Sequence, residues 1–332
     1  MRMADLRVWV AALAVLGAGP VWAECAVPPP AVVDVTATRS YSDDAGTMID
    51  PGLDAQHKKD VEPLTEFLGT VTHDADLAWK HPGEPVSNEA GACAVSWIAA
   101  WAQGRALLGT MESAQAEAER KWDLAGFALA YLKVRSFASN EQRAVVEPWL
   151  IEVADAARAY FDDAGHKRNN HWYWMGLGLG AVGLATESER HWIAARDIAQ
   201  DAGRDVAADG SLPLELARKS RALSYHAFAL MPLVALATLA RSQGEDFYAF
   251  GDGAIDRLAG LVAKGAADSK VFAGMTGEAQ VEPVKPGAGW SQLYALHAPD
   301  AAGAKIAMAR RHRWLGGDVQ MLVRALGAAE QE

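Results

Sequence analysis

The chain has 332 residues, of which 51% are hydrophobic and 22% are charged. This composition excludes a disordered chain, because such chains cannot bury enough apolar surface to offset the entropy lost on ordering. The length allows one large domain or two small ones. The 42 acidic residues outnumber the 31 basic ones and give a net charge of −11. We therefore expect no nucleic-acid partner, since that binding depends on cations that neutralise phosphates.

The first residues have the pattern of a secretory signal peptide. Arg2 and Arg7 give a basic start, and residues 8–16 are apolar but too few to span a bilayer. The small residue Ala23 ends the segment. We expect a signal peptide over residues 1–23 with cleavage after Ala23. No later segment has about 18 uninterrupted apolar residues, so we expect an exported protein without a membrane span.

Cys25 and Cys93 are the two cysteines of the sequence. Two cysteines exclude a disulfide-rich miniprotein and a zinc site built of thiolates. In an oxidising compartment they could form a disulfide. The sequence does not show whether their Cα atoms approach closely enough, so a disulfide and two separate thiols both remain open.

Helical patterns dominate the rest of the chain. Residues 24–50 are expected to be extended, because they include three consecutive prolines and an isolated β-prone stretch at 31–38. Pro232 is expected to kink or split one of the helices that follow. No strand pattern recurs, so we predict an all-α fold with one helical domain over residues 51–332. Apolar residues recur at spacings of three and four in the segments 120–135, 141–161, 187–202, 214–241 and 247–264.

A polar and aromatic cluster occupies residues 167–174, directly before an apolar segment that must be buried. Asn169 or Asn170 could cap a helix there, and His171 could be a packed histidine. Two amides, an imidazole and three aromatic rings within six residues are difficult to satisfy as core alone. We therefore regard this cluster as a candidate site.

A second cluster contains Arg218, Arg221 and Tyr225. On a helix these residues fall at i, i+3 and i+7 and share one face. Two cations beside a phenol favour the phenolate and are expected to lower the pKa of Tyr225, which would make it a usable base. The alternative is a solvated basic face with a tyrosine at its edge.

The two clusters together suit the cleavage of a uronic-acid polymer by β-elimination. Such an enzyme neutralises the sugar carboxylate, removes the C5 proton and protonates the C4 oxygen as it leaves. Arg218, Asn170 and His171 offer partners for a carboxylate. Tyr225 offers a proton acceptor and donor.

Residues 169–174, 209–213 and 218–226 resemble the alginate lyases of polysaccharide lyase family five. The similarity extends over nearly all of the chain after residue 24 and includes Cys25, Cys93, and residues 120–122 and 315–317. The resemblance implies an (α/α) toroid, a periplasmic location and cleavage of polymannuronate by β-elimination without a cofactor. It implies that Asn170 binds the carboxylate, that His171 is catalytic, that Arg218 neutralises the carboxylate and that Tyr225 is the catalytic acid and base.

Some positions depart from the family pattern. Trp172 stands where the family commonly has a small residue, Leu214 where it has Asn, and Ser40 where a basic residue is expected, with Arg39 one position earlier. These departures leave the subsites and the choice of uronate open.

Further residues are candidates for contacts with an anionic polysaccharide. Since salt screens distant charges, we expect a basic cleft within an otherwise acidic surface, built around Arg39, Lys121, Arg218, Lys219 and Arg221. Of three tryptophans, Trp172, Trp174 and Trp290, we expect one to line the groove, and Trp290 follows a loop at residues 285–289 that is a candidate rim. No metal is expected, because no HExxH motif occurs. The candidate substrate-binding residues are Arg39, Lys121, Trp172, Tyr173, Trp174, Arg221 and Trp290.

Three other functions remain open. The uronate could be glucuronate, so that the protein is a glucuronan lyase. A glycoside hydrolase would need two carboxylates about 5–10 Å apart, and Asp209 and Glu215 are the nearest candidates. The chain could also be a non-catalytic, exported polysaccharide-binding protein. We expect a monomer in each case.

Overall fold

The computed structural model describes residues 25–163, 165–281 and 287–329. The expected signal peptide therefore lies outside the described residues. The α-helices are α1 Pro51–Asp60, α2 Glu62–Lys80, α3 Pro85–Gln103, α4 Ala114–Val134, α5 Asn140–Phe161, α6 Asn170–Ala185, α7 Glu189–Asp205, α8 Pro213–Leu216, α9 Ala222–Ser242, α10 Ala254–Ala267, α11 Lys270–Thr276, α12 Trp290–Tyr294 and α13 Val319–Ala329.

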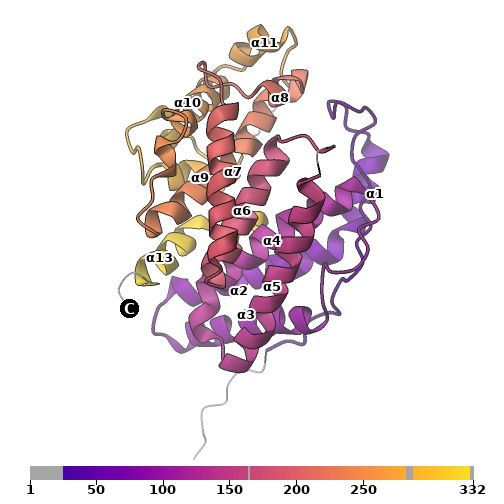
Figure 1. Cartoon of the computed structure of the whole chain (residues 1–332), viewed down its shortest axis with the longest axis vertical. Helices are drawn as coiled ribbons and strands as arrows, with labels where there is room; N and C mark the ends of the chain where they lie inside the picture. The colour runs from indigo at the N-terminus through magenta and orange to yellow at the C-terminus, as the bar shows by residue number, and fades with distance from the viewer. Residues whose placement is uncertain (1–24, 164, 282–286, 330–332) are drawn as a thin grey trace, which may run out of the picture.

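The helices form an inner and an outer layer. The inner helices α2, α4, α6 and α9 contact one another in turn, and α3, α5, α7 and α10 pack outside them. Figure 1 shows α4, α5, α6 and α7 side by side through the centre of the molecule. Helix α13 contacts α2, α4 and α9 and closes the ring. The predicted all-α (α/α) toroid is confirmed.

Inner and outer helices differ in sequence because they are buried differently. Helix α6 is buried on nearly every face, which explains its continuous apolar sequence. Its glycines allow close packing: a Cβ at Gly176 would lie 2.7 Å from Ile198 of α7, and one at Gly180 would lie 2.5 Å from Leu236 of α9. The outer helix α7 buries only one apolar face.

The prediction of one long helix over residues 214–241 is wrong, because the helix is interrupted near its start. The chain forms the short helix α8, a 3-10 turn at Lys219–Arg221 and then α9. The interruption lies at Lys219, whose φ of 49° is incompatible with a right-handed helix. Pro232, where a kink or split was expected, lies within α9, which continues to Ser242 as one buried helix.

The N-terminal segment is non-helical and extended over residues 25–39, as predicted, but residues 41–49 fold back into a short antiparallel hairpin; the segment is fastened to α3. Cys25 and Cys93 form a disulfide with their Cα atoms 5.4 Å apart, which resolves the two alternatives in favour of the bond. The indole N–H of Trp101 donates to the carbonyl of Pro29. The segment is not isolated, because Val35 pairs with Met111 in a parallel bridge.

The C-terminal part contains a short hairpin that the sequence pattern did not predict. Strands β1 Arg311–His312 and β2 Gly317–Asp318 pair antiparallel. Two-residue strands are too short to show a period-2 pattern. The buried ammonium of Lys133 on α4 donates to Asp76 on α2 at 2.6 Å, and Asp76 also accepts the backbone N–H of Asp318. The hairpin is thus anchored to two inner helices.

One apolar helical segment stands out in the described part of the chain. Lys219–Ser242 is long and apolar enough to cross a membrane, and 83% of its apolar stretch is buried inside the protein.

Candidate active site

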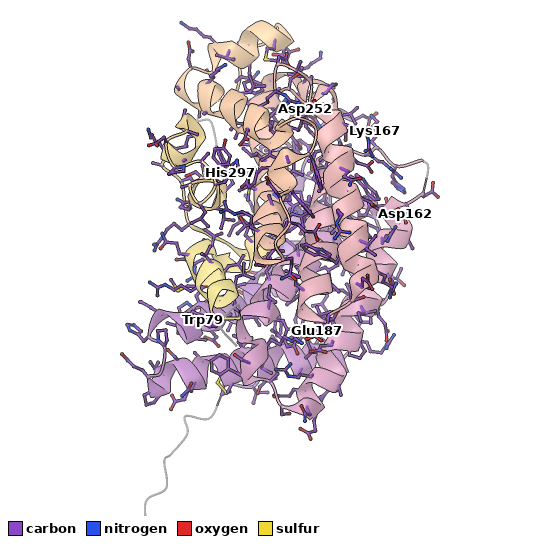
Figure 2. The ribbon with its side chains drawn as sticks, turned by 60° about the vertical axis from the view of Figure 1, so that its left-hand side comes forward. Trp79, Asp162, Lys167, Glu187, Asp252 and His297 are labelled. Carbon is purple, nitrogen blue, oxygen red and sulfur yellow. A yellow bond between two sulfur atoms is a disulfide. The ribbon has the colours of Figure 1, made fainter. Side chains whose placement is uncertain are left out.

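A cavity of about 1070 Å³ lies at the end of the toroid where α6 and α9 begin. Its wall includes the N-terminal loop, residues 39–49, and the hairpin residues His312 and Trp314. Figure 2 shows Lys167, which also lines the cavity, near the upper end of the molecule, and Glu187, just beyond the end of α6, near the lower end. The site therefore lies at the N-terminal end of α6.

The two predicted clusters meet in this cavity. Asn170 and His171 at the start of α6 line it together with Arg218, Arg221 and Tyr225. Arg39 lines it from the N-terminal loop, and Gly287 and Ala288 line it from the loop before Trp290. Residues separated by up to 275 positions, from Arg39 to Trp314, thus line one cavity, and the two clusters meet as the β-elimination hypothesis requires.

Asn170 is held by a buried carboxylate. Asn169 caps α6, accepting the backbone N–H of His171 at 3.1 Å. Asn170 donates its backbone N–H and its side-chain Nδ2 to Oε1 of Glu215, at 2.8 and 2.9 Å. Nε of Arg218 lies 3.9 Å from the other oxygen of Glu215. Glu215 therefore links Asn170 and Arg218, two of the side chains that are expected to bind the carboxylate of a uronate.

His171 is stacked in an aromatic environment and contacts a lysine. Its ring lies 5.5 Å from that of Trp122 and 6.1 Å from that of Phe161. Nδ1 of His171 lies 3.2 Å from Nζ of Lys121. Burial, followed by the charges of Lys121 and Arg218, lowers the pKa of His171 well below its ordinary value. The imidazole is therefore neutral at neutral pH.

The arginines cross-link the cavity wall to the N-terminal loop. Nη1 of Arg218 donates to the carbonyl of Ala45 at 2.6 Å, and Nε of Arg221 donates to the carbonyl of Thr47 at 2.8 Å. Within the loop, the carboxylate of Asp43 accepts two bonds from Thr47. The loop is therefore a defined hairpin that covers the cationic side of the cavity.

Tyr225 is hydrogen-bonded and partly buried. Its hydroxyl donates to that of Tyr41 at 2.9 Å, and the guanidinium of Arg218 lies 4.5 Å from its ring. The prediction of a lowered pKa is wrong: burial, together with Tyr41, raises the pKa of Tyr225 above its ordinary value, and Arg218 offsets only part of this. In the free protein Tyr225 is a neutral phenol.

The predicted aromatic platforms do not line the cavity. Trp172 is buried with its indole N–H donating to Asp201, and Tyr173 donates to Asp205. Trp174 and Trp290 are fully buried in the core. All four side chains are buried in packing contacts. Large aromatic rings serve core packing as well as sugar binding, so the sequence alone does not separate the two uses.

Two predicted cations also lie elsewhere. Lys121 is fully buried behind His171 and does not line the cavity. Lys219 is exposed and forms an ion pair with Glu278 at 3.2 Å. The cationic lining of the cavity instead comes from Arg39, Arg218 and Arg221, with Lys167 at its edge.

Sequence reasoning missed several residues of this site. Trp122 entered the sequence analysis only within the similar stretch 120–122, and Tyr41 and Trp314 were not considered as site residues. The rings of Trp122 and Trp314 stack at 4.5 Å, and both residues line the cavity. They are the candidate sugar platform that the sequence placed on other tryptophans. Their pairing joins α4 to the C-terminal hairpin, so no local sequence signal could reveal it.

The two carboxylates considered for hydrolysis, Asp209 and Glu215, have structural partners. Asp209 accepts bonds from the backbone N–H and hydroxyl of Ser211, and Glu215 is committed to Asn170. Neither lines the cavity. In residues 25–163, 165–281 and 287–329, His, Cys, Asp and Glu side chains do not gather in threes as a metal site requires.

Comparison with known proteins identifies similar sequences over most of the chain. The family model described as alginate lyase matches residues 34–272. A polysaccharide lyase of Stenotrophomonas maltophilia (strain K279a) is 41% identical over 92% of this chain and 93% of its own length. An alginate lyase of Azotobacter chroococcum mcd 1 is 31% identical over 89% of this chain and 82% of its own.

Solved structures share the fold. Alginate lyase A1-III from Sphingomonas species A1 superposes with a TM-score of 0.75 at 22% identity, over 90% of this chain and 85% of that one. A variant of A1-III complexed with a tetrasaccharide superposes with a TM-score of 0.78 at 21% identity and the same coverage. At this identity the likeness establishes the architecture alone.

Proposed function

The chain belongs to the alginate lyase family, and on that premise we propose that it cleaves polymannuronate, the mannuronate form of alginate, by β-elimination. One observation carries this proposal: Asn170, His171, Arg218 and Tyr225 share a single cavity. These are the groups that the reaction needs, and they come from the beginnings of two helices and the turn before one of them.

The first requirement is to make the C5 proton acidic. Asn170, neutral His171 and Arg218 donate hydrogen bonds to the carboxylate at C5, which spreads the negative charge that develops when the proton leaves. Such donors act strongly in a partly enclosed site, because water no longer screens them. Arg218 leaves the carbonyl of Ala45 for the substrate, or shares its remaining N–H groups between them.

The second requirement is proton transfer, which we assign to Tyr225. Its oxygen takes the proton from C5, the electrons of that bond form the C4=C5 double bond, and the C4–O4 bond breaks. The same hydroxyl then protonates O4 of the leaving sugar, so no net proton is gained or lost. Before this step the phenol loses its own proton to solvent; the positive charge of Arg218 favours the phenolate, whereas burial and Tyr41, which accepts the hydrogen bond from Tyr225, oppose it.

The substrate assignment has a direct test. The purified protein is incubated with polymannuronate, polyguluronate and polyglucuronate, and ultraviolet absorbance of the unsaturated product is followed. The proposal predicts the fastest rise with polymannuronate. A rise mainly with polyglucuronate would make the protein a glucuronan lyase, and reducing ends without absorbance would indicate a hydrolase. Binding of oligomannuronate without any product would indicate a non-catalytic binding protein.

We also propose that the protein is exported to the periplasm and acts there as a monomer. The basic and apolar start of the sequence supports export. The disulfide between Cys25 and Cys93 supports an oxidising compartment. Fractionation of cells that express the full chain, with the mass of the mature protein, tests this: cleavage after Ala23 and release with the periplasmic fraction are expected, and a full-length cytoplasmic protein would contradict it.

A further inference from the structure

Lys121 occupies an unusual position behind the cavity. Its side chain is fully buried, and Nζ lies over the rings of Trp122 and Phe161, at 4.0 and 5.1 Å from their centroids. Two polar atoms lie within hydrogen-bond distance of Nζ: the carbonyl oxygen of Ala118 at 3.3 Å and Nδ1 of His171 at 3.2 Å. Lys121 does not line the cavity, so its amine can influence a bound substrate only through its contact with the ring of His171.

We propose that Lys121 is a positioning residue that fixes His171 in the tautomer with its proton on Nε2. In this tautomer the ring donates a hydrogen bond into the cavity. It has no lone pair on Nε2, so it cannot take the C5 proton. The role toward a uronate rests on the proposed function, whereas the tautomer itself does not depend on any substrate.

The argument follows from the donors and acceptors of the two side chains. An ammonium has three N–H bonds and no lone pair, so it can only donate; burial lowers the pKa of Lys121, and the charges of Glu119, Asp123 and Glu117 oppose this and favour the ammonium. When Nζ donates to Nδ1 of His171, that nitrogen must hold its lone pair. His171 is neutral, because burial and the nearby charges of Lys121 and Arg218 disfavour its protonated form. A neutral imidazole has a single N–H bond, which is then on Nε2.

Nε2 of His171 is available for this role. Nδ1 is the ring nitrogen used by Lys121, and within the described residues no protein group is hydrogen-bonded to Nε2. The residue lines the cavity beside Asn170 and Arg218. A carboxylate bound there would meet N–H donors from all three side chains. Tyr225 then remains as the group with an oxygen able to accept the C5 proton.

The tautomer can be measured directly by NMR. The full mature chain is labelled with ¹⁵N-histidine, and two-bond ¹H–¹⁵N correlations of the imidazole rings are recorded at pH 7 without substrate; His171→Gln identifies the signals of His171. His226 is an internal reference for the opposite tautomer, since its Nδ1 donates to the carbonyl of Ala222 and its Nε2 accepts the N–H of Leu212. We expect the pattern of His171 to be the reverse of that of His226.

The role of Lys121 is tested with Lys121→Met, which keeps an unbranched apolar stem between the aromatic rings but has no N–H donor. We expect the signals of His171 to change to a mixture of tautomers or to the Nδ1–H form, and kcat on polymannuronate to fall about tenfold or more, since one oriented donor is lost. Lys133→Met is the matched control: it removes a second buried lysine of α4, about 18 Å away along the helix. It lowers stability but leaves the tautomer of His171 unchanged.

Two results would overturn the proposal. One is a wild-type His171 that carries its proton on Nδ1 or is doubly protonated at pH 7. The other is a Lys121→Met protein with the wild-type tautomer. If Lys121→Met does not fold, the wild-type spectrum still decides. If the wild type cleaves none of the three polyuronates, the proposed function fails, while the spectrum tests the Lys121 assignment independently.

Discussion

Buried polar side chains that never face the cavity determine how its residues are held. Glu215 is the clearest case: it is 1% exposed and accepts two hydrogen bonds from Asn170 while lying near Arg218. Burial raises the pKa of Glu215, and the bonds from Asn170 oppose this rise. The sequence identified Asn170 and Arg218 but could not show that Glu215 joins them, because that contact spans 45 residues.

Replacement of Glu215 should separate this positioning role from simple folding. Glu215→Ala leaves the backbone and side-chain N–H groups of Asn170 without an acceptor, and each buried unpaired group costs about 1–3 kcal/mol. We expect a lower free energy of unfolding and a kcat/KM reduced at least tenfold. Glu215→Gln keeps an oxygen acceptor and should recover most of both. Denaturant unfolding and product absorbance measure the two effects, and a fully active Glu215→Ala protein would refute the role.

At the scale of elements, the N-terminal loop (residues 39–49) completes the site. The apolar period predicted α5 almost to the residue, because this signal is local; the capping box of Ser139, which is also local, was not used. They predicted an extended N-terminal segment but not the contacts between its loop and the arginines. Those contacts bring together residues more than 170 positions apart, and such pairings leave no periodic signal.

Gly46 connects the geometry of this loop to Arg218. Its φ is +67°, and a Cβ there would lie 2.5 Å from Nη1 of Arg218. We expect Gly46→Ala to displace the guanidinium and to lower kcat/KM on polymannuronate about tenfold, roughly 1.4 kcal/mol. Gly83→Ala is the matched control, because Gly83 has a φ of +85° but no atom within 4 Å of such a Cβ. Equal activity of the two variants in the absorbance assay would contradict this explanation.

At the scale of the whole molecule, links distant in sequence close the toroid. The disulfide spans 68 residues and ties the N-terminal segment to α3, while the buried pair of Lys133 and Asp76 anchors the C-terminal hairpin. Helical periodicity and low β content were sufficient to predict the fold class. The closure by hairpin and α13 was not predictable, because it depends on buried charges whose partners lie far apart in the chain.

The acid stability of the whole protein should depend on buried imidazoles. Burial lowers the pKa of His226 and of His312 to about 4, below the unfolded value near 6.5. Between these values the unfolded state binds more protons, so the stabilising contribution is present above pH 6.5 and is lost as pH falls to about 4. For His226 this is about 3 kcal/mol.

Unfolding by denaturant at several pH values between 7 and 4.5 measures this effect. His226→Gln should have a lower free energy of unfolding at pH 7. On acidification, its free energy of unfolding should fall with a smaller slope against pH, because unfolding takes up about one proton fewer. The same slope in the variant and the wild type would show that His226 is not responsible.

The claim that Asn170, His171 and Arg218 hold the carboxylate while Tyr225 transfers the proton is tested most directly with Tyr225→Phe. The variant lacks only the hydroxyl, so its fold and its affinity for oligomannuronate should remain close to those of the wild type. General acid–base catalysis contributes about 10²–10⁴-fold. We therefore expect the rate of unsaturated-product formation to fall by at least about 100-fold. A Tyr225→Phe protein that forms product at the wild-type rate would contradict the account.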